Sequence, residues 1–142
     1  MKKRNNSLIK QVIYVSTPVG FNGKILDSIL AQSKANNKKN DITGALICRS
    51  DLYLQYLEGP AHKIDFIYSK IKLDNRHTDV TLLEDGRSKR RLFSNWAMRD
   101  DPFKDLMWTK QEVADGAINR LSKGDAMKIF VQHSREVDQF LS

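Results

Sequence analysis

The order of strand-like and helix-like segments constrains the fold of this chain more than any other feature. The strand-like segments are rich in β-branched and aromatic residues, and they comprise residues 9–16, 42–48, 52–57, 79–83 and a segment around Phe93 and Trp96. The helix-like segments repeat apolar residues every three or four positions, and they comprise residues 23–36 and 61–74. The expected order is therefore β-α-β-β-α-β-β.

Polar and glycine-containing pairs mark the expected ends of these segments. Asn36 and Asn37 are expected to end the first helix, and Asp74 and Asn75 the second. The pair at residues 85–86, Asp-Gly, predicts a turn that leads from the fourth strand toward the fifth.

This order predicts an α+β fold of the ferredoxin-like kind, with both helices on one face of a largely antiparallel sheet. The first and third strands are then neighbours at the centre of the sheet. Residues 109–121 and 124–141 carry two further helical patterns, and we expect this C-terminal helical pair to cover the other face. The chain accordingly divides into a domain over residues 1–100 and a C-terminal helical extension over residues 101–142.

Composition argues against several classes of protein. The chain has 142 residues and a formal net charge of +7, which invites a nucleic-acid partner. Part of that charge lies in residues 2–4 and 87–91, which we interpret as solvated surface, so a nucleic-acid partner is not favoured. Cys48 is the only cysteine, and no Cys/His cluster has metal-ligand spacing. No segment has the roughly 20 apolar residues of a membrane span. We expect a cytoplasmic protein with no metal.

One polar residue in an apolar strand is the most informative single position. Gln55 interrupts the apolar run from Tyr53 to Leu57, and a buried carboxamide without partners costs about 1–3 kcal/mol. Taken alone, an edge-strand glutamine that faces water explains it better. The topology, however, puts Tyr14 beside Gln55, so that a phenol and a carboxamide face a groove between the two helices.

The rim of that groove is also polar. Asn36 and Asn37 at the end of the first helix and Arg76 after the second can reach it, which suits a flat heteroaromatic ligand. Phosphate-binding loops, dinucleotide-binding glycines and nucleophile elbows are absent from the sequence, and no histidine has a catalytic neighbour in a known motif. We therefore expect a binding protein rather than an enzyme.

The sequence resembles the BLUF family of flavin-binding blue-light sensors over about its first hundred residues. The matching motifs follow the family's order, and they comprise residues 13–16, 36–37, 42–44, 54–60, 74–77 and 91–98. Any one of these motifs is weak, but the series in register is highly specific. Asp41 departs from the family pattern, which usually has glycine before the ITG motif.

The resemblance implies that FAD is held without a covalent bond between the two helices, with FMN and riboflavin as alternatives. Asn36 and Asn37 would hydrogen-bond the pyrimidine edge of the flavin ring, because amides match its acceptor and donor groups. Arg76 would lie near the C2 carbonyl or the pyrophosphate, and His77 near the ring or its ribityl chain.

The resemblance also implies photochemical roles for two residues. After the flavin absorbs blue light, Tyr14 donates an electron and then a proton. The Gln55 amide rotates or tautomerises, which reverses the hydrogen bonds around the flavin and shifts its absorption to longer wavelength.

Output is expected to pass through Trp96 and Met98, with Ser33 as a partner for Trp96. No effector enzyme domain follows in the sequence, so we expect a short stand-alone sensor that acts on an unidentified protein partner, through self-association into a homo-oligomer. Two alternatives remain, a ferredoxin-like nucleic-acid-binding module and a small acylphosphatase-like hydrolase.

Overall fold

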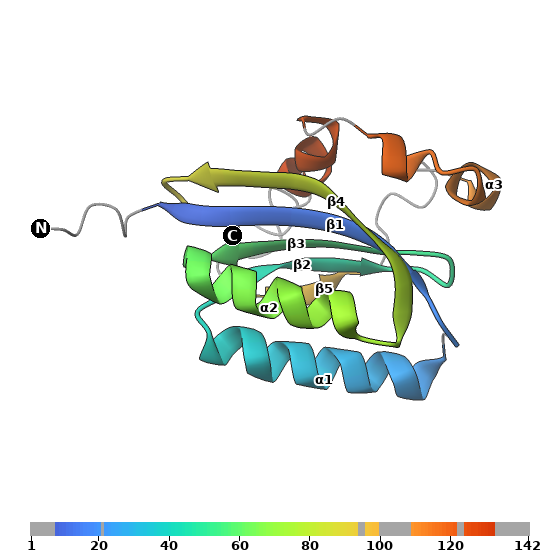
Figure 1. Ribbon diagram of the computed structural model, residues 1–142, viewed down its shortest axis with the longest axis horizontal. Coiled ribbons are helices and arrows are strands. Elements are labelled where there is room, and N and C mark those ends of the chain that lie inside the picture. Colours follow the sequence, from blue (N-terminus) through green and yellow to red (C-terminus); the bar gives the residue numbers. More distant parts are fainter. Residues whose placement is uncertain (1–7, 21, 94–95, 100–108, 122–123, 133–142) are drawn as a thin grey trace, which may run out of the picture.

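The computed structural model describes residues 8–20, 22–93, 96–99, 109–121 and 124–132, which form one sheet between two helical layers (Figure 1). The strands are β1 (Ile9–Pro18), β2 (Thr43–Cys48), β3 (Tyr53–Gly59), β4 (His77–Ser88) and β5 (Trp96–Arg99). The order in the sheet is β4-β1-β3-β2-β5, with antiparallel pairs except for the parallel pair β2–β5. The predicted ferredoxin-like α+β arrangement is confirmed.

Helices α1 (Gly23–Lys39) and α2 (Ala61–Leu73) cover one face of this sheet, as predicted (Figure 1). Asn22 begins α1 by accepting a hydrogen bond from the Ile25 N–H at 2.9 Å. A buried apolar core joins both helices to the sheet, and it contains Val12, Ile42, Leu46, Tyr53, Leu57, Ile64 and Ile67. Within the described ranges, no helix is both long and apolar enough to cross a bilayer.

C-terminal segments cover the other face of the sheet (Figure 1). They are α3 (Lys110–Ala114), the 3₁₀ helix η2 (Ile118–Arg120) and a helix over residues 124–132. Their buried residues Ile118, Ala126 and Phe130 share a core with the sheet residues Ile13, Val15, Ala45, Ile47, Leu54 and Tyr56. The expected single helix over residues 109–121 is wrong, because α3 ends before Gly116, whose φ of +83° an ordinary residue rarely adopts. Residues 133–141 of the second expected helix lie outside the described residues.

The central strands bring the two predicted key residues together. Tyr14 of β1 pairs directly with Gln55 of β3. The same transverse row continues to Leu46 of β2 and to Met98 of β5. Because side chains alternate along a strand, Tyr53, Gln55 and Leu57 point to the face covered by α1 and α2.

Two expected boundaries are wrong. Helix α1 does not end at Asn36 and Asn37 but continues to Lys39, and the backbone N–H of Asn40 bonds to the carbonyls of both asparagines. The asparagines thus lie inside the last turn, where their side chains point sideways from the helix. Asp41 follows with φ +59°, the left-handed conformation in which glycine is usual, and an aspartate tolerates it better than most residues.

The turn expected at residues 85–86 is also wrong. Strand β4 runs through that pair, and Gly86 lies opposite Gln11 in the β1–β4 ladder. After Ser88 the chain crosses the sheet, and β5 adds to the far edge beside β2. Pairing with the long strand β1 therefore overrides the local turn preference of an Asp-Gly pair.

Candidate functional site

Tyr14 and Gln55 meet in the groove between α1 and α2. The Tyr14 hydroxyl donates a hydrogen bond to Gln55 Oε1 at 2.5 Å. Both side chains are buried, with 5% and 4% of their surface exposed. The pair follows from the register, because directly opposed residues of antiparallel strands lie about 5 Å apart. Gln55 also lines a pocket, and among the described residues no group accepts a hydrogen bond from its Nε2.

Burial has the largest effect on the pKa of the Tyr14 phenol. It raises the pKa of Tyr14 far above the ordinary value, and the ionisable groups of Cys48 and Tyr68 raise it further. Rings surround the phenol, with the Tyr68 centroid at 5.9 Å and the His77 centroid at 6.1 Å. The phenol is therefore a protonated donor throughout the neutral pH range.

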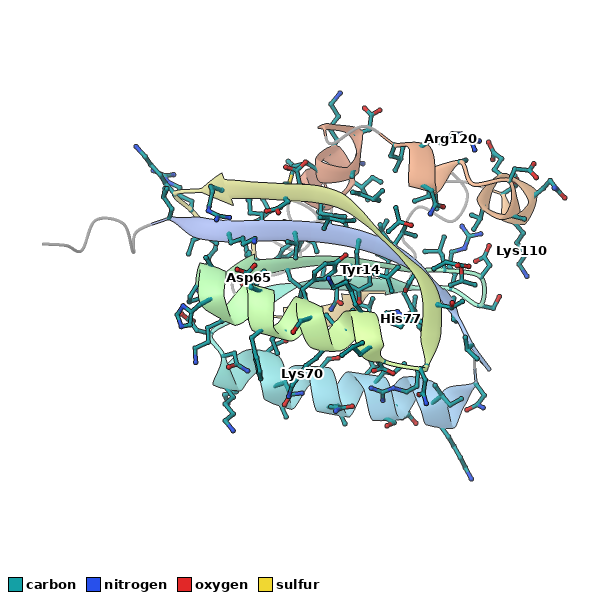
Figure 2. The ribbon with its side chains drawn as sticks, viewed as in Figure 1. Tyr14, Asp65, Lys70, His77, Lys110 and Arg120 are labelled. Carbon is teal, nitrogen blue, oxygen red and sulfur yellow. The ribbon has the colours of Figure 1, made fainter. Side chains whose placement is uncertain are left out.

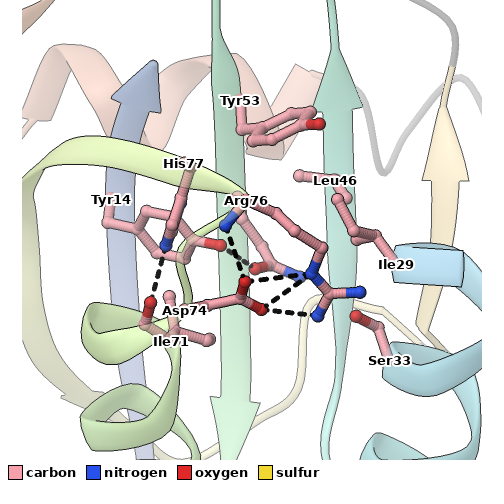
Figure 3. A pocket seen from close by; sticks show the side chains of 10 residues that line it. Tyr14, Ile29, Ser33, Leu46, Tyr53, Ile71, Asp74, Arg76 and His77 are labelled. Atoms are coloured by element: carbon pink, nitrogen blue, oxygen red, sulfur yellow. Dashed lines mark hydrogen bonds and ion pairs between the residues drawn. The ribbon is translucent and has the colours of Figure 1, made fainter. Parts of the chain in front are cut away.

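His77 lies beside Tyr14, and both of its ring nitrogens have partners, of which Figure 3 draws the one at Ile71. Its Nε2 lies 2.6 Å from the carbonyl oxygen of Ile71, so Nε2 must carry a proton and donate. Its Nδ1 lies 2.7 Å from the hydroxyl of Ser16, which is buried on β1. In the neutral ring Nδ1 thus accepts from Ser16, and the imidazole is locked against the end of α2.

Arg76 spans the groove from the end of α2 to α1 (Figure 3). Its Nε donates to Asp74 Oδ1 at 2.9 Å, and a second guanidinium nitrogen pairs with Asp74 Oδ2 at 2.5 Å. The hydrogen bonds from Arg76 are the largest cause of a pKa of Asp74 below the usual range. On the opposite side the guanidinium donates to Gln32 at 2.8 Å and to Ser28 at 3.3 Å, both on α1.

The groove contains two adjoining hollows. The inner one, of about 60 Å³, is lined by Tyr14, Gln55 and His77 together with the apolar side chains of Ile29 and Leu46. The outer one, of about 280 Å³, opens between α1 and α2. Four residues line both hollows, and they are Ser33, Ile71, Asp74 and Arg76. The two hollows are therefore parts of one groove with apolar walls and polar groups along its floor and rim.

Asn36 and Asn37 line the outer hollow. Their backbone carbonyls accept from residues after the helix, including the Ile42 N–H at 2.8 Å from the Asn37 oxygen. Asn37 is only 3% exposed, and within the described residues no hydrogen bond holds either side-chain amide. Both donors and acceptors of these amides are thus available to a ligand in the groove.

The expected relay residues are only partly described. Ser33 lines both hollows from α1. The backbone of Trp96 lies beside Gly44, and that of Met98 beside Leu46, which is one strand away from Gln55. The side chains of residues 96–99 lie outside what the structure describes, so the expected pairing of Ser33 with Trp96 stays a prediction.

Sequence reasoning missed the groups that hold Arg76. Asp74 is expected from the sequence only to end the second helix, and no pattern in the sequence points to Gln32 or Ser28. The sequence contains a signal for the Asp74–Arg76 pair, since an acid two residues before an arginine can form a local bidentate pair. Gln32 and Ser28 are four residues apart, and so share the helix face that also carries Asn36.

Comparison with known proteins identifies a matching family. A family model described as "Sensors of blue-light using FAD", BLUF, matches residues 9–99. The photoactivated adenylate cyclase subunit alpha of Euglena gracilis is 27% identical over 95 residues, which are 65% of this chain and 9% of that protein. The chain thus corresponds to about a tenth of the length of the curated relatives that it matches.

Solved structures of a light-regulated enzyme and of a BLUF protein also align with this chain. A bacterial light-regulated adenylyl cyclase aligns with a TM-score of 0.61 and 27% identity, over 92% of this chain and 36% of that chain. BlrB, described as a BLUF protein in its dark state, aligns with a TM-score of 0.70 over 90% of this chain and 96% of that one. Its identity is 22%, so it supports the fold alone. The family match, together with the fold, defines a sensor domain. The chain belongs to the BLUF family of blue-light sensors.

Proposed function

We propose that this protein is a blue-light photoreceptor that binds FAD without a covalent bond and stores the light signal as a changed hydrogen bond between Tyr14 and Gln55. Membership of the BLUF family supports the sensor class. The observation that carries the proposal is the buried Tyr14–Gln55 hydrogen bond of 2.5 Å at the inner hollow, with Gln55 Nε2 available to a ligand.

The residues of the groove fit a flavin ring. A flat, largely apolar ring system suits walls of Ile29, Ile71 and Leu46. Its carbonyl and ring N–H groups need acceptors and donors, and the amides of Asn36 and Asn37 offer both without a net charge. We assign these two asparagines to the polar edge of the ring. Arg76 and His77 are assigned to the rim and the inner end of the same groove.

When bound and excited by blue light, the flavin supplies a strong one-electron oxidant. The contribution of the chain is a donor that can lose an electron and then a proton. Tyr14 fits this role, because burial keeps its phenol protonated and its proton already points at Gln55 Oε1. Tyr14 regains the electron and the proton when the charges recombine, so no net chemistry remains.

Gln55 retains the changed hydrogen bonding after the charges recombine. Its carboxamide has a donor end and an acceptor end, so rotation or tautomerisation exchanges what it offers to Tyr14 and to the ligand. The burial of Gln55 excludes water from this exchange, and water would otherwise replace either partner.

We further propose that residues 1–100 form the sensor domain, and that residues 101–142 act as an output segment. The signal would pass from Gln55 through Met98, Trp96 and Ser33 to that segment, and from there to a cytoplasmic protein partner or a second copy of the chain. Sheet contacts support this direction, because β5 lies beside β2 and the C-terminal core lies on the same sheet. The nucleic-acid alternative loses support, since residues 118–130 include side chains that cover the sheet face it would need.

The decisive experiment is Tyr14→Phe in the flavin-loaded protein. We expect flavin binding to be retained, because the lost hydroxyl contacts Gln55 rather than the outer hollow, and the reversible long-wavelength shift under blue light to disappear. Tyr68→Phe is the matched control, since its ring is 5.9 Å from that of Tyr14. A full light-induced shift in Tyr14→Phe would refute the mechanism, and failure of the wild-type protein to bind any flavin would refute the function.

A further inference from the structure

The outer end of the groove has an excess positive charge. Among its described lining residues are one carboxylate, Asp74, and two cations, Arg76 and Lys70. Arg76 and Asp74 form a bidentate pair, and the guanidinium also donates hydrogen bonds to Gln32 and Ser28. Lys70 is therefore the cation that can offer an unneutralised charge to a ligand in the outer hollow.

Lys70 lies on the flank of α2 that faces α1 (Figure 2). Lys63, two turns earlier on the same flank, reaches Asn40 at the end of α1 with its Nζ at 3.5 Å from Oδ1. No carboxylate among the described residues pairs with the ammonium of Lys70. It lies instead 4.6 Å from the centroid of the Phe66 ring, one turn earlier on α2.

This cation–π contact limits where the ammonium can go. Phe66 is half exposed, and its ring holds the ammonium at the mouth of the groove instead of leaving it free in solvent. A positioned cation loses less side-chain entropy when it binds an anion than a freely rotating one does. The structure thus provides a partly organised site for a single anionic group.

We propose that Lys70 binds the phosphate of a flavin nucleotide and makes this site select FMN and FAD over riboflavin. The inference rests on the proposed function. A flavin ring that lies against Gln55 with its polar edge at Asn36 and Asn37 has the outer hollow as the way out for its side chain, because the two hollows adjoin. The phosphate is the first charged group on that side chain. Arg76, which the family resemblance places near the C2 carbonyl or the pyrophosphate, is already engaged by Asp74.

The expected selectivity is modest. An exposed ion pair at low ionic strength changes an affinity by about threefold to fivefold. The preference should disappear at roughly 1 M salt, where the Debye length is about 3 Å. Riboflavin has the same ring and ribityl chain without the phosphate, so its affinity isolates the contribution of the ring site.

The test is flavin titration of the apoprotein in the dark with riboflavin, FMN and FAD, followed by quenching of flavin fluorescence. Wild-type protein should bind both nucleotides about threefold to fivefold more tightly than riboflavin at low salt. In Lys70→Gln the three affinities should become equal, while riboflavin affinity and the size of the light-induced shift stay at wild-type values. Lys72→Gln, whose ammonium lies over the Tyr68 ring on the other flank of α2, should keep the preference.

Three results would overturn the proposal. Equal binding of riboflavin and FMN by the wild-type protein at low salt would show that no phosphate site exists. An equal loss of selectivity in Lys70→Gln and Lys72→Gln would show a general charge effect. A protein that binds no flavin at all would overturn the proposed function as well, whereas a protein that binds flavins and shifts under light without selectivity would lose this inference alone.

Discussion

Two tyrosines lie buried on opposite faces of the sheet, and each has a different partner. Tyr14 donates to an amide on the side of α1 and α2. Tyr56 lies on the other face, accepts from Gln11 at 2.9 Å and donates to Glu58 at 2.7 Å. Burial raises the pKa of both phenols well above the ordinary value, and for Tyr56 the charge of Glu58 adds to the effect.

These raised pKa values predict a loss of stability in alkaline solution. The phenols ionise near pH 10 in the unfolded chain, but stay protonated in the folded protein, so unfolding releases protons above about pH 10. The stabilising effect of Tyr14 and Tyr56 is complete below that pH and declines as the pH rises further, by up to about 1.4 kcal/mol per pH unit and phenol. Urea unfolding of the wild type and of Tyr14→Phe between about pH 9 and pH 11 measures this.

Tyr14→Phe should show a smaller decline over the same range, since one of the two phenols is gone. An unchanged slope would mean that Tyr14 ionises as easily in the folded protein as in the unfolded one.

The pairing of Tyr14 with Gln55 could be predicted from the order of the strands, but the role of Glu58 could not be predicted from its motif alone. Glu58 is fully buried in β3. The reasoning that singled out Gln55, a polar residue in an apolar strand, applies equally to Glu58. Its four partners come from three separate segments, and only the fold brings them together.

At the scale of elements, Glu58 forms hydrogen bonds with the segment that leads from β4 to β5. One carboxylate oxygen accepts from the Tyr56 hydroxyl and the Leu92 N–H, both at 2.7 Å. The other accepts from the Thr43 hydroxyl and the Phe93 N–H, both at 2.8 Å. Both backbone donors belong to the segment that crosses the sheet just before β5.

Replacing this carboxylate with an amide should be costly. In Glu58→Gln one acceptor oxygen becomes an NH₂ group that faces a hydroxyl and a backbone N–H. The hydroxyl can turn and accept from the NH₂ group, but the backbone N–H cannot, so a buried backbone donor loses its acceptor. We expect a loss of about 2–4 kcal/mol in the free energy of unfolding, measured by urea denaturation. Glu84→Gln, on the edge strand β4, should change it by less than about 0.5 kcal/mol. Equal effects of the two substitutions would contradict this role of Glu58.

Element order was predictable and element ends were not, for a physical reason. Periodicity reports which face of a segment is buried, so α1, α2 and the central strands were predicted well. Their ends depend on tertiary contacts, such as the pairing of Gly86 with Gln11 that keeps β4 extended through a turn sequence. The segment before β5 bonds to Glu58 through two backbone N–H groups, a contact between distant parts of the chain that no local pattern reports.

At the scale of the whole molecule, the two faces of one sheet contribute side chains to two separate cores. The helix over residues 124–132 inserts Phe130, which is fully buried and stacks on Tyr56 with ring centroids 5.5 Å apart. The helix over residues 124–132 is thus part of the folded unit, and it contacts the face of β3 opposite to the one that carries Gln55.

Phe130→Ala should therefore destabilise the entire protein rather than free the C-terminal segment alone. We expect a loss of about 3–5 kcal/mol in the free energy of unfolding, with one cooperative transition. Lys128→Ala, exposed on the same helix, is the control and should stay within about 0.5 kcal/mol. A separate early transition of the C-terminal segment, with the sheet unchanged, would contradict a shared core.

The strand order also indicates which strand pair costs least to form. Of the strand pairs in the described sheet, β2–β3 alone joins neighbours along the chain, and every other pair must close a longer loop. The entropy lost in closing a loop grows with its length, so this hairpin is the least costly pair to form first. Strand β1 can then add to β3, β4 to β1 and β5 to β2. We accordingly expect the strand that carries Gln55 to be the one on which the rest of the sheet assembles.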